Sequence, residues 1–260
     1  MSISAIVSKC KRCLNIGKNF PGNIIENPVI VLCYHRVTTL ACDEHLLAVS
    51  PLNFRNQIKY ICENFHVQKF DAPWNHKELS FVITFDDGYA DNLYEALPIL
   101  QEFSIPATFF VTSGFIGSNK EFPWDGGHSP TRKEYRQLSH DELIQLANNE
   151  LVTIGSHTLT HRQLSSLSYE EQKKEIIIGH HLLEELVGKK LNAMSYPFGN
   201  YNDINVFSQD ICRTLGIFRA ATNYPGQAHS WTNSMAIPRH IIRNYDDAEF
   251  RKHLFRFRFL

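Results

Sequence analysis

Short apolar runs, rich in β-branched and aromatic residues, alternate along the chain with longer segments in which apolar residues recur every three to four positions. The runs have the length of buried strands, and the longer segments have the periodicity of helices that cover a sheet. This alternation is typical of parallel strands joined by helical crossovers. The predicted strands are residues 29–34, 81–85, 107–112, 152–156, 193–196 and 218–222, and the predicted helices are residues 53–64, 92–103, 141–149, 169–187 and 203–215.

Local signals fix some of the predicted boundaries. Ser139 and Ser168 each begin a Ser-x-x-Glu sequence, in which the hydroxyl caps the first turn and the glutamate reaches back to the serine amide. Gly188 suits the left-handed residue that ends many helices. Residues 114–136 have no clear period, and we predict a long loop there, of the kind that carries a binding surface.

Composition and charge narrow the class of protein. The chain has 260 residues, of which 43% are hydrophobic, enough for a substantial core. The 26 Lys and Arg nearly balance the 27 Asp and Glu, so we do not expect a nucleic-acid partner. No run approaches the roughly 20 apolar residues of a transmembrane helix. The pattern specifies no oligomeric state.

The N-terminus lacks the apolar region of a secretory signal. We therefore expect a cytoplasmic protein, with peripheral membrane association left open, in which residues 1–27 form an extension and residues 28–260 a single domain. The six cysteines are too irregular to predict a disulfide framework, and we expect no function for the isolated Cys10-x-x-Cys13. Residues 250–260 interleave Phe with basic residues, which favours a packed terminal helix over a membrane-surface contact.

Titratable residues lie at the carboxyl ends of two predicted strands, where α/β barrels place their active sites. Asp86 and Asp87 are adjacent there, and two partly desolvated acids need a metal ion or a basic partner to stay ionised together. The alternative is an acidic turn that only ends the strand. His157 and His161 follow another strand, and with one carboxylate they make a metal site with open positions. The alternative is a chance pair among the 13 histidines.

Two further motifs end predicted strands. Tyr-Pro-Phe-Gly at residues 196–199 can turn backbone amides toward a ligand, or can simply terminate the strand. His35 follows the first strand, where a lone histidine is more often a structural residue.

Together, Thr-Phe-Asp-Asp-Gly at 84–88, His-Thr-x-x-His at 157–161 and Tyr-Pro-Phe-Gly at 196–199 resemble the successive motifs of the polysaccharide deacetylase family, also called the NodB-homology or carbohydrate esterase 4 family. The match covers about residues 28–245. It implies an α/β fold, a distorted and incomplete (β/α)7 barrel. It also implies that one divalent metal ion assists removal of N-acetyl groups from amino sugars. Zinc is expected, and cobalt, nickel, manganese or iron are alternatives.

The resemblance also implies roles for single residues. The implied metal ligands are Asp87, His157 and His161. Asp86 becomes the general base for the metal-bound water, since a cation lowers the pKa of the water and the unligated carboxylate can take the proton. The Phe198 amide would complete an oxyanion hole.

The chain departs from the usual family pattern at two places. Many members carry an arginine where this chain has Ser195, and Arg239 is the expected replacement that tethers Asp86. His240 fits the spacing of the family's C-terminal histidine loosely, whereas His35 lies in a Tyr-His sequence typical of the deacetylases of biofilm exopolysaccharide, poly-N-acetylglucosamine. We expect His35 rather than His240 to be the general acid.

Aromatic residues near the motifs are candidates for substrate binding. Sugar rings stack on aromatic faces, and core packing is the alternative role. The predicted substrate contacts are Tyr89, Trp124, Pro197, Phe198 and Trp231. The sequence thus predicts a deacetylase of a polysaccharide or glycan precursor; a lipid-linked, nucleotide-linked or non-sugar amide substrate, or a non-catalytic carbohydrate-binding protein, is the alternative.

Overall fold

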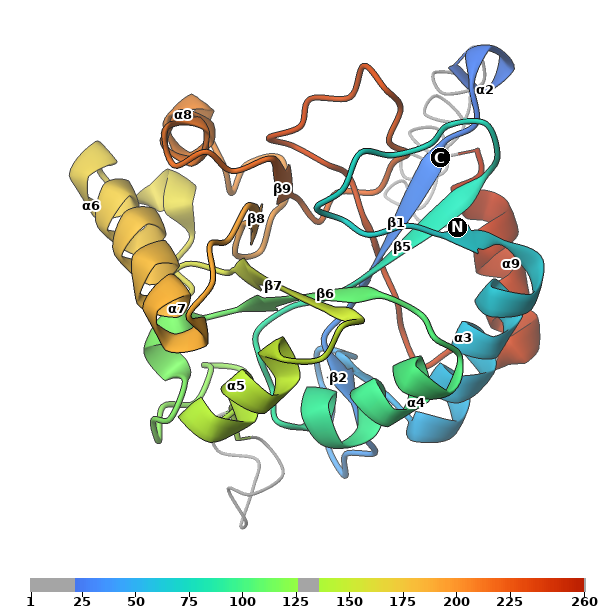
Figure 1. Cartoon of the computed structure of the whole chain (residues 1–260), viewed down its shortest axis with the longest axis horizontal. Helices are drawn as coiled ribbons and strands as arrows, with labels where there is room; N and C mark the ends of the chain where they lie inside the picture. The colour runs from blue at the N-terminus through green and yellow to red at the C-terminus, as the bar shows by residue number, and fades with distance from the viewer. Residues whose placement is uncertain (1–21, 126–135, 260) are drawn as a thin grey trace, which may run out of the picture.

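A computed structural model describes residues 22–125 and 136–259 (Figure 1). Its main sheet is parallel, in the order β10-β1-β5-β6-β7-β8-β9, with the short β4 beside β5. Among the described residues, the sheet continues beyond β9 only as a bridge between Ala221 and Ile237, so the barrel is incomplete. The expected distorted (β/α)7 architecture is confirmed. The strands of the path are β1 Val29–Tyr34, β5 Ser80–Phe85, β6 Ala107–Val111, β7 Val152–Ser156, β8 Ala193–Ser195, β9 Arg219–Ala221 and β10 His240–Ile241.

The central strands are buried on both faces. Every residue of β1 and β5 is buried, which is why these strands read as continuous apolar runs. Side chains alternate along a strand, so Ile30 and Leu32 pack in the cluster formed with the helices, whereas Val29 and Val31 pack with Phe110 inside the barrel. This alternation decides which residues of the strand ends point inward, toward the site.

Helices surround the sheet (Figure 1). They are α2 Gly22–Ile25, α3 Pro51–Asn64, α4 Leu97–Glu102, α5 His140–Ala147, α6 Tyr169–Lys173, α7 Gly179–Val187, α8 Val206–Thr214 and α9 Asp247–Phe257. Both predicted capping boxes, at Ser139 and Ser168, are present, and Gly188 ends α7 with a positive φ of 65°. The apolar residues of α9, Phe250, Leu254 and Phe257, are buried, so the chain ends in the expected packed helix.

Some elements differ from the sequence expectations. Two predicted helices each contain a π-helical turn, η1 Asn92–Ala96 before α4 and η5 Lys174–Ile178 between α6 and α7. The helix predicted from residue 203 begins at Val206, because the Asn205 side chain caps its first turn. Four two-residue strands, too short to show a period, are absent from the predicted ranges: β2 Arg36–Val37, β3 Ala48–Val49, β4 His66–Val67 and β10.

Several predictions concern parts of the chain outside the described residues. Cys10, Cys13 and most of the extension at 1–27 lie there, as does the middle of the predicted loop at 114–136. Cys33, Cys62 and Cys212 are free thiols. Within residues 22–125 and 136–259, each helix is too short or too polar to cross a bilayer.

Candidate metal centre and active site

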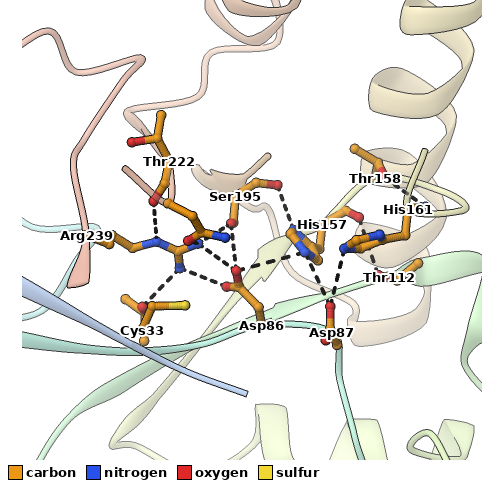
Figure 2. Close-up of polar contacts among 12 residues, drawn as sticks. Cys33, Asp86, Asp87, Thr112, His157, Thr158, His161, Ser195, Thr222 and Arg239 are labelled. Atoms are coloured by element: carbon orange, nitrogen blue, oxygen red, sulfur yellow. Dashed lines mark hydrogen bonds and ion pairs between the residues drawn. The ribbon is translucent and has the colours of Figure 1, made fainter. Parts of the chain in front are cut away.

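The polar residues singled out from the sequence meet at the carboxyl ends of the parallel strands (Figure 2). Asp86 and Asp87 follow β5, His157 follows β7, Ser195 ends β8 and Arg239 precedes β10. Because the strands are parallel, their carboxyl ends share one edge of the sheet, so residues far apart in the chain lie side by side.

The loops that carry these residues have a strained backbone. Of the six non-glycine residues with positive φ in the described part of the chain, four belong to the site: Asp87 at 78°, Thr158 at 64°, His161 at 59° and Phe198 at 60°. Such conformations cost free energy and persist where the surroundings impose them, often at functional sites. The fold therefore imposes the conformation of the loops that present the site residues.

Asp87, His157 and His161 form a compact group of three potential ligands. Oδ1 of Asp87 lies 3.5 Å from Nε2 of His157 and 3.4 Å from Nε2 of His161. Both carboxylate oxygens of Asp87 are buried without a hydrogen-bond partner. Ligand bonds of about 2.0–2.1 Å in a tetrahedral site separate neighbouring ligand atoms by about 3.3–3.5 Å. The donor set and its spacing therefore fit a single divalent cation, and three protein ligands leave the fourth position of a tetrahedral site to water or substrate.

The two imidazoles are prepared for such a role. Nδ1 of His157 lies 2.8 Å from the carbonyl oxygen of Ser195, which leaves Nε2 facing Asp87. Burial, with the neighbouring His157, lowers the pKa of His161 to about 4, so its ring is neutral at pH 7. Burial raises the pKa of Asp87, but the nearby imidazoles of His157, His35 and His161 outweigh it and leave that pKa below its usual value. A neutral imidazole and an ionised carboxylate are the forms that bind metal.

Asp86, next to Asp87, is held in a different way. Arg239 donates to both of its oxygens, at 2.8 Å to Oδ1 and 2.6 Å to Oδ2, and Ser195 donates to Oδ2 at 3.2 Å. Both charged side chains are fully buried. Burial raises the pKa of Asp86, but the Arg239 charge outweighs this effect and holds that pKa far below its ordinary range. Arg239 thus lies where a tether of Asp86 was expected.

Arg239 is fixed by further acceptors around the barrel. Its Nε donates to the Thr222 carbonyl at 2.8 Å, Nη1 to Thr84 Oγ1 at 3.1 Å and Nη2 to Asn223 Oδ1 at 2.6 Å. Asn223 and Thr222 were not predicted. Their place at the end of β9 is the signal that could have indicated them, since Asp86, Asp87 and His157 also follow strand ends.

The two candidate acids lie on opposite sides of the sheet. His35 is 8% exposed, and a ligand atom of its ring lies within 4.8 Å of a carboxylate oxygen of Asp86. His240 follows the inward-pointing Arg239 and therefore points outward, where its ring stacks on Phe257 of α9 at 3.8 Å. The structure does not bring His240 to the site, so its inclusion among the catalytic candidates was wrong.

The predicted substrate contacts separate into two groups. Trp124 and Phe198 lie beside the metal ligands, with the Trp124 and Phe198 rings 5.1 Å and 4.9 Å from the ring of His161. Phe198 is 45% exposed, and no described residue accepts a hydrogen bond from its amide. Pro197 is buried beneath it, so Pro197 shapes the turn and is not a surface for substrate.

Two other predicted contacts were wrong. Tyr89 is fully buried, and its hydroxyl donates to Asp125 at 2.6 Å and accepts from the Trp124 indole at 3.0 Å. It therefore holds the loop in place and offers no face to a sugar. Trp231 stacks on His229, next to the bridge between Ala228 and Val29. Val29 begins β1, so Trp231 lies at the opposite end of the barrel.

Comparisons with known proteins agree with this geometry. A family model described as Polysaccharide deacetylase matches residues 75–217. YxkH of Bacillus subtilis (strain 168) is 27% identical over 151 residues, which cover 58% of this chain and 47% of that protein. The poly-beta-1,6-N-acetyl-D-glucosamine N-deacetylase of Escherichia coli (strain K12) is 26% identical over 141 residues, 51% of this chain and 21% of that protein. The matches thus span less than half of either relative.

A solved structure shares the fold. The Streptococcus pyogenes deacetylase PplD, determined in complex with acetate, superposes with a TM-score of 0.71 over 88% of this chain and 98% of that one. The two sequences are 20% identical.

Because Arg239 and Asp86 form a buried ion pair, replacing Arg239 should strongly destabilise the folded protein. We expect Arg239→Leu to lower the free energy of unfolding of the metal-free protein by about 3–5 kcal/mol at pH 7, because it leaves Asp86 buried without its counter-charge. Arg239→Lys keeps the charge and should lose less. Urea unfolding measures both, with Arg251→Leu, in an exposed pair with Asp247, as the control that should change little. Equal losses in Arg239→Leu and the control would contradict the prediction.

The raised pKa of Asp125 in the folded protein should make stability depend on pH. Burial raises its pKa to about 6, against an ordinary value near 4 in the unfolded chain, so stability falls as pH rises through this interval. We expect Asp125→Asn, which can still accept from Tyr89, to raise the free energy of unfolding of the metal-free protein at pH 7 by about 1–3 kcal/mol. The gain should shrink toward pH 4. Urea unfolding across this range measures it, and a gain that does not vary with pH would rule out the explanation.

Proposed function

Because the chain belongs to the polysaccharide deacetylase family, we propose that it removes N-acetyl groups from amino sugars of a polysaccharide with one divalent metal ion, zinc first among the candidates. One observation carries the proposal. Two adjacent buried carboxylates have opposite surroundings, since Asp87 has no hydrogen-bond partner and faces two imidazoles, whereas Asp86 is held by Arg239. Metal-assisted hydrolysis needs a group that binds the metal ion next to a group that can accept a proton, and Asp87 and Asp86 are placed to serve as these two groups.

The residues of the chain divide the work. Asp87, His157 and His161 would hold the cation, which when bound lowers the pKa of water and polarises the amide carbonyl. Asp86 takes a proton at its carboxylate, and Arg239 fixes the direction in which that carboxylate points. Since Arg239 also makes Asp86 a weak base, Asp86 can act only on a water that is already acidic.

His35 and Phe198 complete the proposed mechanism. Burial lowers the pKa of His35, which makes its protonated form a stronger donor to the leaving amine. The Phe198 amide, held at a positive φ of 60°, would donate to the oxygen that becomes negative during attack. Trp124 and the half-exposed Phe198 ring are the aromatic surfaces beside this point on which a sugar can pack.

The substrate we propose is a polymer of N-acetylglucosamine. The Tyr-His sequence at His35 supports it, as does the similarity to the Escherichia coli deacetylase, whose name specifies poly-beta-1,6-N-acetyl-D-glucosamine. Lipid-linked or nucleotide-linked amino sugars and non-sugar amides are the alternatives that a substrate panel separates.

Acetate release by Asp86→Asn tests the proposal. We expect the metal-reconstituted protein to release acetate from N-acetylglucosamine oligomers and Asp86→Asn to lose at least about 100-fold in kcat, because the base is removed while the ligands remain. Glu185→Gln, an exposed change on α7, is the matched control. Metal binding without acetate release from any oligomer, nucleotide-linked or lipid-linked substrate would contradict deacetylation and favour a carbohydrate-binding protein.

The assignment of the acid is tested by a pair of histidine variants. We expect His35→Ala to lower kcat by about 100-fold or more and to remove one limb of the pH profile, since the leaving amine loses its proton donor. His240→Ala changes a ring that packs on Phe257, and kcat of its folded fraction should stay close to the parent value. Near-normal turnover by His35→Ala would eliminate His35 as the acid.

A further inference from the structure

The segment between the two histidine ligands is a strained turn with backbone hydrogen bonds to its surroundings. Thr158 and His161 have φ of 64° and 59°, and the His161 amide donates to Thr158 Oγ1 at 3.2 Å. The Leu159 carbonyl accepts from the Gly114 amide at 2.9 Å. Because His161 lies at the far end of this turn, any relaxation of the turn moves one ligand relative to the other. The geometry of the site therefore depends on what holds residues 158–160.

A single buried carboxylate binds the middle of this turn. Glu175 is 6% exposed, and it accepts from the Thr160 amide at 2.8 Å and from Thr160 Oγ1 at 2.5 Å. Its own carbonyl accepts from the Leu159 amide at 2.9 Å. Three groups of the turn thus donate hydrogen bonds to Glu175. This residue lies 14 positions after His161, in the helical turn η5.

The helix is adapted to present Glu175 in this way. Glu175 lies in the π-turn η5, where the wider hydrogen-bond register disturbs the α-helical pattern and lets a carbonyl accept from outside the helix. Gly179 begins α7 beside the turn, and a Cβ there would lie 2.5 Å from the Leu159 nitrogen. A side chain at this position would push the helix away from the turn. The π-turn and the glycine therefore permit the approach that the three hydrogen bonds require.

We propose that Glu175 is a positioning residue for the metal ligands, and that it sets the distance and orientation of His161 relative to His157 and Asp87. The inference rests on the metal site of the proposed function. It extends the site to a helical residue outside the three motifs that carry the family resemblance. Residues that hydrogen-bond directly to metal ligands typically change metal affinity or activity by about 10–100-fold when they are replaced, and we expect an effect in this range from Glu175, which holds the turn between two ligands.

Metal affinity tests the proposal without any substrate. Zn²⁺ affinity is measured by competition with a chelator, and the visible absorption of Co²⁺ reports the geometry of its ligands. We expect Glu175→Gln to weaken Zn²⁺ binding by about 10–100-fold and to alter the Co²⁺ spectrum, because its amide nitrogen cannot accept from Thr160. Thr160→Val, which keeps the amide bond to Glu175, should show a smaller loss in the same direction. Glu185→Gln, the same change at an exposed position of α7, should match the parent protein.

The outcomes separate this inference from the proposed function. Parent affinity and an unchanged Co²⁺ spectrum in Glu175→Gln, even with a lower melting temperature, would overturn the positioning role and leave the deacetylase proposal standing. If Glu175→Gln does not fold, Thr160→Val decides by the same two readouts. A parent protein that binds neither metal would overturn both, whereas Glu175-dependent metal binding without acetate release supports the positioning role alone.

Discussion

The ion pair between Arg239 and Asp86 determines how the polar end of the barrel is organised. Two adjacent aspartates at a buried strand end repel each other, and both can remain ionised only if each has its own positive partner. Arg239 neutralises Asp86 with two parallel hydrogen bonds, and its remaining donors bind Thr222, Thr84 and Asn223. Asp87 is then left to face the two histidines. The ion pair thus gives two chemically identical carboxylates different surroundings, even without a bound ligand.

The same interaction explains a departure from the family pattern. Ser195 occupies the position at which many members carry an arginine, and its hydroxyl lies between Asp86 and Arg239, at 3.2 Å and 2.7 Å. A small side chain on β8 makes room for a long one that arrives from the strand on the other edge of the sheet. The guanidinium therefore reaches Asp86 from a different strand. Asp86 therefore keeps an arginine partner, although this arginine lies 44 residues after Ser195 in the chain.

The sequence was sufficient for features that depend on period and on strand ends. Continuous apolar runs predicted β1 and β5 because both faces of these strands are buried, and the strand-end rule placed Asp87 near His157. Trp231 could not be placed in this way, because a long irregular connection carries it to the far end of the barrel. Tyr89 was misread since an aromatic residue next to a motif has the same sequence signal whether its face is free or packed. The support from Glu175 depends on a π-turn, which leaves the apolar period of residues 169–187 intact.

The order of the strands has a consequence for how the protein is made. β10 pairs with β1, so the last strand of the sheet lies beside the first, and Arg239 joins a site whose other members have all been synthesised earlier. A nascent chain that has emerged only as far as α8 already contains both aspartates and both histidines, but Asp86 lacks its counter-charge. Docking of the segment that carries Arg239 and β10 is therefore thermodynamically linked to burial of that carboxylate. Closure of the sheet by β10 is therefore coupled to the pairing of Asp86 with Arg239.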